Sequence, residues 1–255
     1  MKGKVAVVTG GSSGIGKAIA LRLRERGWEL VLVARGEERL AKVAEELGAE
    51  AEPCDVGERE GIEQLADRVG RRHAAVGLLV NNAGIPGGGN FLDVSSERVE
   101  EVTRTNYLGS VWCLKAFLPL LERETPSDVV NVASVAGTVS VGASGPYTAA
   151  KHAQLAFSRS VAVELAPRGI RVHSILPGWV ETDRFPDSTL RSKLPDWMVM
   201  QPEKVADATL RALDHNRREV FVPESYRVVA AAQGLAPATL GRLFALVGGP
   251  RRLRG

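Results

Sequence analysis

The sequence predicts an α/β protein with a doubly wound parallel sheet in a single domain, residues 1–255, and three observations support this. Short apolar segments alternate with helical stretches of ten or more residues, which is typical of parallel strands joined by crossover helices. The apolar segments lack a polar alternation, as expected where helices cover both faces of a sheet. Polar residues or glycines follow the strands, and ligands of such sheets bind beyond the carboxyl ends of the strands.

The first part of the chain alternates strictly between strand and helix. Residues 5–8 form an apolar strand, and a glycine-rich turn leads from it into a helix whose apolar residues recur at three- and four-residue steps. We expect further strands at 30–33, 49–54 and 78–80, and helices at 37–47 and 58–73. The loop 85–90, with three successive glycines, is expected to be a flexible connection.

The second part continues the pattern and then departs from it. A long helix at 96–121, a strand at 129–132, a helix at 146–165 and a strand at 170–175 are expected, followed by a helix at 201–215 and an edge strand at 219–222. The irregular stretch 179–200 is interpreted as a substrate lid. A helical C-terminal extension, 224–255, is expected to pack on the body or on a neighbouring subunit, with a membrane surface as the alternative.

Composition excludes several classes of function. The net charge of +3 comes with no basic stripe or aromatic platform, so nucleic-acid binding is not expected. Two cysteines and four scattered histidines give no metal-ligand spacing and no disulfide framework. With the first strand entered by residue 3, no signal peptide is expected and a reducing, cytoplasmic location is the default.

The turn after the first strand is suited to a phosphate. Gly10, Gly14 and Gly16 allow tight turning, close approach of a pyrophosphate and close helix–strand contact. The N–H groups of the turn and the positive end of the helix would meet the phosphates. The candidate cofactor residues of this turn are Gly10, Ser12, Ser13, Gly14, Ile15 and Gly16.

Six motifs occur together in a fixed order. They are Thr9-Gly10-x3-Gly14-x-Gly16, Asn81-Asn82-Ala83-Gly84, Asn106, Ser134, Tyr147-x3-Lys151 and Pro177-Gly178. Over residues 3–182 the sequence thereby resembles the short-chain dehydrogenase/reductase family, and the 13 residues from Ser134 to Tyr147 match the spacing in that family. The resemblance implies a Rossmann-type fold and hydride transfer between a nicotinamide and a carbonyl or alcohol. One departure is Gly77, where the family often has an aspartate.

The resemblance implies four catalytic residues: Asn106, Ser134, Tyr147 and Lys151. Tyr147 would exchange a proton with the substrate oxygen, and Lys151, one helical turn away, would lower the pKa of the phenol from about 10. Ser134 would hydrogen-bond the oxygen, and Asn106 would hold a water that links Lys151 to solvent. The alternatives are a surface pair for Tyr147 and Lys151, a helix cap or turn for Ser134, and a buried hydrogen-bonding role for Asn106.

The second strand ends Val33-Ala34-Arg35-Gly36, without the carboxylate that would select NAD. Arg35 would pair with the 2′-phosphate of NADP(H), which is therefore the predicted cofactor. The alternative is that Arg35 caps the strand in solvent. By resemblance, the remaining cofactor contacts are Asp55, Val56, Asn82, Ala83, Gly84, Tyr147, Lys151, Pro177, Gly178, Val180 and Thr182.

The lid composition favours a hydrophobic ketone or secondary alcohol as substrate. The predicted apolar lining is Ile85, Val141, Trp179, Phe185, Leu190, Leu194, Trp197 and Met198. Reduction of 3-oxoacyl thioesters is an alternative, and a non-catalytic dinucleotide-sensing protein is a second one. A homodimer or homotetramer is expected through the helices at 96–121 and 146–165, with Val111, Leu114, Phe117 and Leu118 in the interface unless they face the sheet.

Overall fold

The computed structural model describes the chain except for residues 1–3, 88, 90–91, 141–143, 183–197 and 240–255. Among the described residues, seven parallel strands form one sheet in the order β3-β2-β1-β4-β5-β6-β9. These strands are β1 (Val5–Thr9), β2 (Glu29–Ala34), β3 (Glu50–Pro53), β4 (Leu78–Asn81), β5 (Ser127–Val132), β6 (Ile170–Pro177) and β9 (Glu219–Val222). The order reverses between β1 and β4, which creates the switch point at which ligands of such sheets bind.

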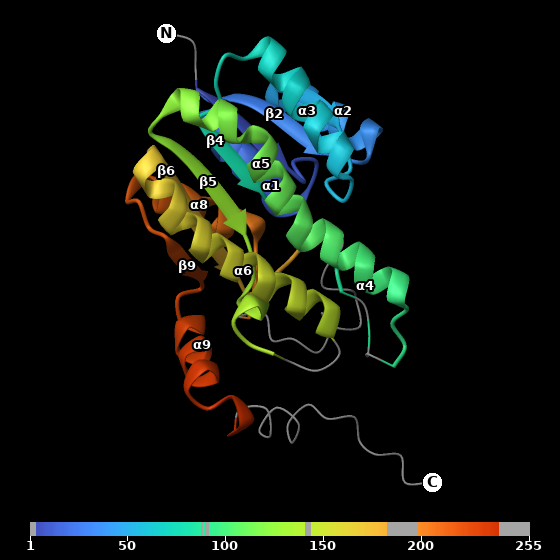
Figure 1. Ribbon diagram of the computed structural model, residues 1–255, viewed down its shortest axis with the longest axis vertical. Helices are drawn as coiled ribbons and strands as arrows, with labels where there is room; N and C mark the ends of the chain where they lie inside the picture. The colour runs from blue at the N-terminus through green and yellow to red at the C-terminus, as the bar shows by residue number, and fades with distance from the viewer. Residues whose placement is uncertain (1–3, 88, 90–91, 141–143, 183–197, 240–255) are drawn as a thin grey trace.

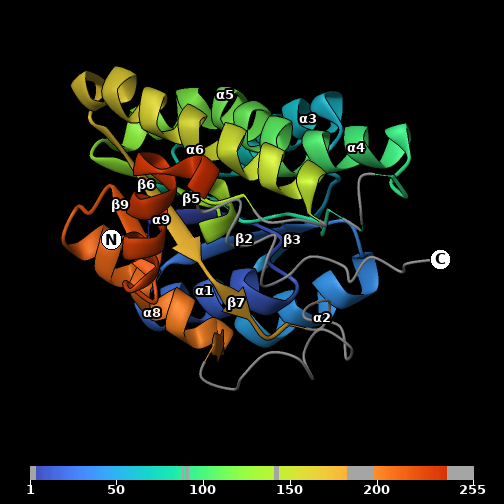
Figure 2. The same cartoon turned by 90° about the horizontal axis from the view of Figure 1, so that it is seen from below.

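Helices cover both faces of the sheet, so the molecule has three layers (Figure 2). One face carries α1 (Gly14–Glu25), α2 (Glu37–Leu47) and α8 (Pro202–Asp214), and the other carries α3 (Arg59–Arg72), α4 (Ser96–Thr103), α5 (Gly109–Leu121) and α6 (Gly145–Leu165). The strands are buried on both sides: within β1, Ala6 and Val8 belong to one apolar core and Val5 and Val7 to the other. The prediction of a doubly wound α/β sheet is confirmed.

The expected elements lie close to their predicted positions, and two differences matter for the site. The helix expected at 96–121 contains a π-helical segment, Arg104–Leu108, between α4 and α5. The stretch expected to be irregular contains two short strands, β7 (Trp179–Val180) and β8 (Val199–Met200), which pair in parallel. A two-residue pairing leaves too short a pattern for sequence periodicity to detect.

Two of the four residues expected in a subunit interface face the sheet instead. Leu114 and Phe117 are buried in the apolar core between the sheet and the helices α3 and α5. Val111 and Leu118 are partly buried. The alternative interpretation of Leu114 and Phe117, as core residues of this chain, is therefore correct.

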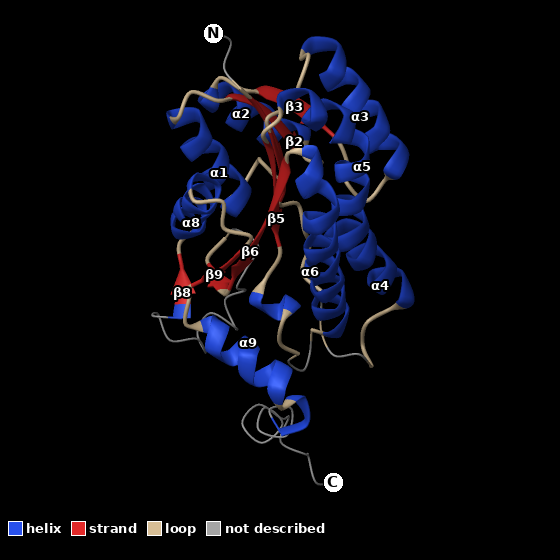
Figure 3. Cartoon of the chain, turned by 60° about the vertical axis from the view of Figure 1, so that its left-hand side comes forward, coloured by secondary structure: helices blue, strands red, loops and turns tan. Residues whose placement is uncertain are grey.

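The C-terminal extension begins with α9 (Tyr226–Leu235), which lies beyond the sheet at the end where the strand arrows point (Figures 1 and 3). All of α9 is described and none of its residues is buried, although Tyr226, Val229 and Ala230 pack against a small apolar cluster. None of the helices in the described part of the chain combines the length and the hydropathy that a bilayer span would need.

Candidate active site

The turn between β1 and α1 has the geometry of a phosphate-binding loop. Gly10 and Gly14 have φ angles of +67° and +51°, in the region that favours glycine. A Cβ atom on Gly16 would lie 2.2 Å from the carbonyl oxygen of Gly10, so the turn cannot close around a larger residue. In the described structure the Ser13 side chain makes no capping bond to α1. The backbone N–H groups at the positive end of α1 are therefore available to an anion, as a pyrophosphate requires.

Side chains around this turn tie it to the next strand. The Thr9 hydroxyl donates to the Val80 carbonyl (3.1 Å) and accepts from the backbone N–H groups of Asn82 (3.0 Å) and Ala83 (3.1 Å). The Asn82 amide donates to the Thr9 carbonyl at 2.9 Å. Thr9 was not among the predicted site residues, although its place at the carboxyl end of the first strand is a signal that could have found it.

Thr182 comes from far along the chain to the same turn. Its methyl group lies 3.0 Å from the position that a Cβ atom of Gly14 would take. The predicted cofactor residues Gly10, Gly14, Asn82 and Thr182 are thus brought together by the structure. The bare backbone, the helix end and this cradle fit a dinucleotide pyrophosphate.

The residue predicted to select the cofactor, Arg35, follows β2 and is exposed. Its guanidinium lies 3.3 Å from a carboxylate oxygen of Asp55 and 4.0 Å from one of Glu101. The other oxygen of Asp55 accepts from the backbone N–H of Gly57 at 2.8 Å. Arg35 and Asp55, both predicted at the adenosine end, are therefore neighbours, and the exposure of Arg35 directly after β2 is also what the alternative of a strand cap in solvent predicts.

Asn106 lies in the π-helical segment and is completely buried. Its side-chain oxygen accepts from the Ile85 backbone N–H at 2.7 Å, and its side-chain nitrogen donates to the Ile85 carbonyl at 2.8 Å. The side chain therefore fixes the loop after β4, as the alternative for this residue proposed. Wider helical turns of this kind are rare and frequent at functional sites.

Ser134 and Tyr147 meet at the carboxyl end of β5. The Ser134 hydroxyl caps the short turn Val135–Gly137, accepting from the Ala136 N–H at 3.1 Å. The same hydroxyl is close enough to Tyr147 to influence the pKa of the phenol. Burial raises the pKa of Tyr147, and the interaction with Ser134 lowers it in part. The capping interpretation of Ser134 and the catalytic one are thus both compatible with its position.

Lys151 follows Tyr147 on the same face of α6, with its ammonium 5.9 Å from the centre of the phenol ring. The residue is 3% exposed, and burial lowers the pKa of its ammonium to about 7. The expected lowering of the Tyr147 pKa by Lys151 is wrong for this structure, because burial has the larger effect on the phenol and also weakens the positive charge beside it. The pairing of the two residues along the helix is confirmed.

Sequence reasoning missed the partners of the Lys151 ammonium. It donates to the Val132 carbonyl at 2.9 Å and to the side-chain oxygen of Gln154 at 2.9 Å. Gln154 is completely buried, and its nitrogen donates to the Ser110 hydroxyl at 2.7 Å. A glutamine three residues after Lys151, on the face of α6 that carries Leu155 and Ser158 into the core, was the available signal.

The substrate side of the site is described in part. Pro177 ends β6 and Gly178 follows it, and the ring of Tyr226 from α9 packs so closely on Gly178 that an added Cβ atom would lie 2.3 Å from the ring. Ile85 and Val180 are buried, and Trp179 and Met198 are partly buried. Val141, Phe185, Leu190, Leu194 and Trp197, predicted to line the substrate, lie outside the described residues.

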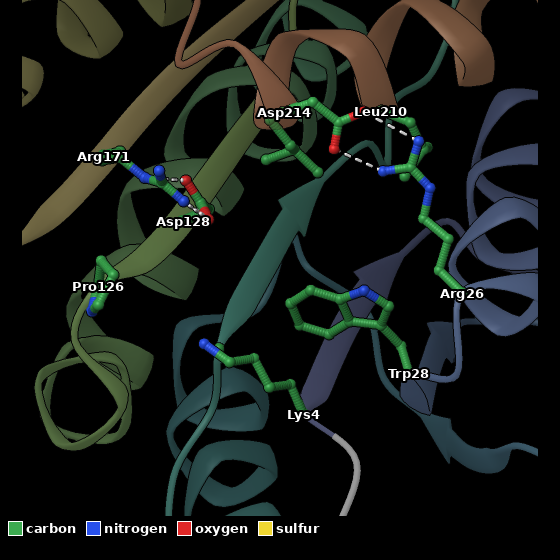
Figure 4. A pocket seen from close by; sticks show the side chains of 10 residues that line it. Lys4, Arg26, Trp28, Pro126, Asp128, Arg171, Leu210 and Asp214 are labelled. Carbon is green, nitrogen blue, oxygen red and sulfur yellow. Dashed lines mark hydrogen bonds and ion pairs between the residues drawn. The ribbon is translucent and has the colours of Figure 1, made fainter.

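A hollow of about 230 Å³ lies at the opposite, amino end of the strands (Figure 4). Its charged side chains are joined in pairs: Arg26 with Asp214 at 2.7 Å, and Arg171 with Asp128 through two hydrogen bonds. The Trp28 ring and the Lys4 side chain face the same space. The sequence motifs all lie at the other end of the sheet, so this hollow is not the candidate active site.

Comparison with known proteins agrees with this geometry. A sequence model described as short chain dehydrogenase matches residues 4–192. A protein of Streptomyces coelicolor named "Putative ketoacyl reductase" is 42% identical over 217 residues, 82% of each chain.

Two solved structures are also similar. A variant of the actinorhodin polyketide ketoreductase with NADPH is 36% identical, with a TM-score of 0.75 over 82% of this chain and 89% of that one. A Burkholderia phymatum short chain dehydrogenase/reductase in complex with NAD is 26% identical, with a TM-score of 0.83 over 94% and 96%. The two structures thus carry different nicotinamide dinucleotides.

Proposed function

The chain belongs to the short-chain dehydrogenase family, and on this premise we propose that it transfers a hydride between NADP(H) and a hydrophobic ketone or secondary alcohol. The observation that carries the proposal is that Tyr147 lies near both Ser134 and Lys151 at the carboxyl end of β5. The glycine turn lies at the same end of the sheet, after β1. A proton donor and a dinucleotide cradle therefore share one edge.

The chain's own residues supply the proton and the alignment. In reduction, the Tyr147 hydroxyl gives its proton to the substrate oxygen as negative charge develops there, and in oxidation it takes the proton back. Ser134, which lies near Tyr147, donates to the same oxygen. Lys151 holds a positive charge beside the phenol and favours its ionised form when it is protonated. The nicotinamide, when bound, supplies or accepts the hydride.

The preference for NADP(H) rests on Arg35. Its side chain is half-exposed and its pairing with Asp55 is long, at 3.3 Å. A ribose phosphate offers a guanidinium a stronger, charge-assisted and bidentate partner. Asp55 and Val56 would lie at the adenine, and Asn82, Ala83 and Gly84 along the cofactor, as in the family.

The substrate side is proposed to be apolar. The lid, about 179–200, and the C-terminal extension, about 224–255, would close over the substrate, and the packing of Tyr226 on Gly178 supports a place for α9 beside the mouth. Subunit pairing would use the helical stretch 96–121, which includes α4 and α5, together with α6, where Val163 is 66% exposed. A single monomer mass from light scattering after size exclusion would contradict this pairing.

Reduction of a 3-oxoacyl thioester is a second candidate. Two similar proteins, the one from Streptomyces coelicolor and the actinorhodin enzyme, carry the names of ketoacyl and polyketide ketoreductases. Both candidates use the same proton donor and cofactor, and they differ in what the site mouth must accept.

One assay separates them. Purified protein is given aryl, alicyclic and long-chain ketones, polar polyols and acetoacetyl-coenzyme A, each with NADPH and NADH, and is read at the nicotinamide absorbance. Fastest turnover of apolar ketones with NADPH supports the proposal, and fastest turnover of the thioester supports the second candidate. Cofactor binding without turnover of any carbonyl or alcohol would instead support a non-catalytic dinucleotide-sensing protein.

A further inference from the structure

The partners of the Lys151 ammonium identify one more residue that serves the reaction. Lys151 is 3% exposed, and among the described residues no carboxylate contributes to the shift of its pKa, which burial alone lowers. Two neutral oxygens accept hydrogen bonds from the ammonium: the Val132 carbonyl of β5 and the side-chain oxygen of Gln154, both at 2.9 Å. Among the described residues, the titratable side chain whose ring faces the ammonium is that of Tyr147.

Gln154 is itself held in place. It is completely buried one helical turn after Lys151, and its nitrogen donates to the Ser110 hydroxyl of α5 at 2.7 Å. The Lys151 ammonium can only donate, so reversing the amide would bring two donors together at that end, whereas the Ser110 hydroxyl can accept or donate. The oxygen of Gln154 is therefore fixed toward Lys151.

We propose that Gln154 is a positioning residue that holds the Lys151 ammonium against the inner wall of the site, with Ser110 bonding the other end of the amide. The inference rests on the proposed role of Lys151. A hydrogen bond accepted from an ammonium favours its charged form, so Gln154 offsets part of the cost of burying Lys151. Without it, the protein would hold less charge beside the Tyr147 phenol near neutral pH.

Three variants on α6 test this. Gln154→Leu keeps the size and removes the acceptor, and Gln154→Glu keeps an acceptor and adds a negative charge. Ser158→Ala is the matched control: Ser158 is 1% exposed, lies one turn further along the same helix and bonds Asn131 at 2.6 Å. The titration of Lys151 is followed by the ¹³Cε shift in lysine-labelled protein without cofactor, assigned with Lys151→Arg.

The expected midpoint falls by about one to two pH units in Gln154→Leu, the effect of one charge-assisted hydrogen bond. It rises in Gln154→Glu and stays at the parent value in Ser158→Ala. The high-pH limb of kcat for ketone reduction moves in the same directions, with the KM for the ketone unchanged. A merely structural role would lower the melting temperature of Gln154→Leu without moving the midpoint.

The outcomes separate this inference from the proposed function. If the midpoint is the same in the parent and both Gln154 variants, the positioning role is wrong even where the enzyme reduces ketones. If the midpoint moves as expected but no carbonyl or alcohol is turned over by the parent protein, the positioning role holds and the proposed function is wrong.

Discussion

The two ends of the sheet treat buried charge in opposite ways. At the amino end, the Asp128 carboxylate lies between the guanidinium of Arg171 and the ring of His173, at 2.6 to 2.9 Å. Burial alone would raise the pKa of Asp128, but hydrogen bonds from His173 and Arg171 outweigh it and hold the pKa below its usual range. At the carboxyl end, the described residues place only neutral oxygens on the Lys151 ammonium.

The difference separates stability from chemistry. A charge that is fully paired stays charged over the physiological range and fastens β5 to β6, whereas an ammonium buried among neutral acceptors loses its proton near pH 7. Strongly shifted groups of the second kind are typical of functional sites. The comparison predicts that changes at the carboxyl end alter turnover and that changes at the amino end alter the free energy of unfolding.

Of the changes at the carboxyl end, Tyr147→Phe should reduce turnover most. Removing the hydroxyl leaves the ring in place and deletes the proton donor, so kcat should fall by about two to four orders of magnitude. The melting temperature and the Kd for NADPH should stay close to those of the parent, as measured by scanning calorimetry and fluorescence titration. Turnover within a few-fold of the parent would show that another group supplies the proton.

Asp128→Asn, at the amino end, should instead lower the free energy of unfolding. It leaves Arg171 and His173 without their carboxylate, and loss of one member of such a cluster costs about 3–5 kcal/mol. Since the folded pKa of Asp128 is lowered, its contribution is present above the unfolded pKa of about 3.9 and is lost as the pH falls through the folded value. Urea unfolding at pH 7 should therefore show the full loss, while kcat at 25 °C should not change. A loss of turnover in protein that remains folded would mean that the two ends are not independent.

Lys151→Met tests the comparison through the pH dependence of the free energy of unfolding. Because the folded pKa of Lys151 is about 7 and the ordinary value 10.5, the unfolded chain binds a proton between these values that the folded chain does not. Parent stability should then rise relative to the variant across this window, by about 1.4 kcal/mol per pH unit. Parallel stability curves of the two proteins from pH 7 to 10 would show that Lys151 titrates normally.

Most of the fold was predictable because its signals are local. The helix Glu37–Leu47 was placed at both ends by its pattern and by Gly48, which adopts a φ of +58°. The π-helical segment was not predictable, because residues Arg104–Leu108 follow ordinary helical periodicity, and the bonds that the segment makes join it to a distant loop. The Asn106 amide bonds the backbone of Ile85, 21 residues away.

The site was predictable in its residues and not in its electrostatics. Motif spacing identified Tyr147 and Lys151 as neighbours, which the structure confirms. Spacing carries no information on burial, and burial decides both pKa values, raising that of the phenol and lowering that of the ammonium. Gln154 was missed for the same reason, since its bond to Lys151 matters only because both side chains are removed from water.

Arg35→Ala has the smallest expected effect, because it removes an exposed charge at the carboxyl end. The guanidinium shares Asp55 with the backbone, and the side chain is 45% exposed, so its loss should change the free energy of unfolding by no more than about 0.5 kcal/mol. One charge-assisted contact to a 2′-phosphate is worth about 1.5–3 kcal/mol, so the Kd for NADPH should rise about 10- to 100-fold. The Kd for NADH should not rise, because NADH lacks the 2′-phosphate that Arg35 would contact.

Arg159→Ala, which removes an arginine paired with Glu219 at 2.9 Å, is the control for loss of surface charge. Equal weakening of NADPH and NADH in fluorescence titrations would show that Arg35 supports the adenosine end as a whole and does not select the phosphate.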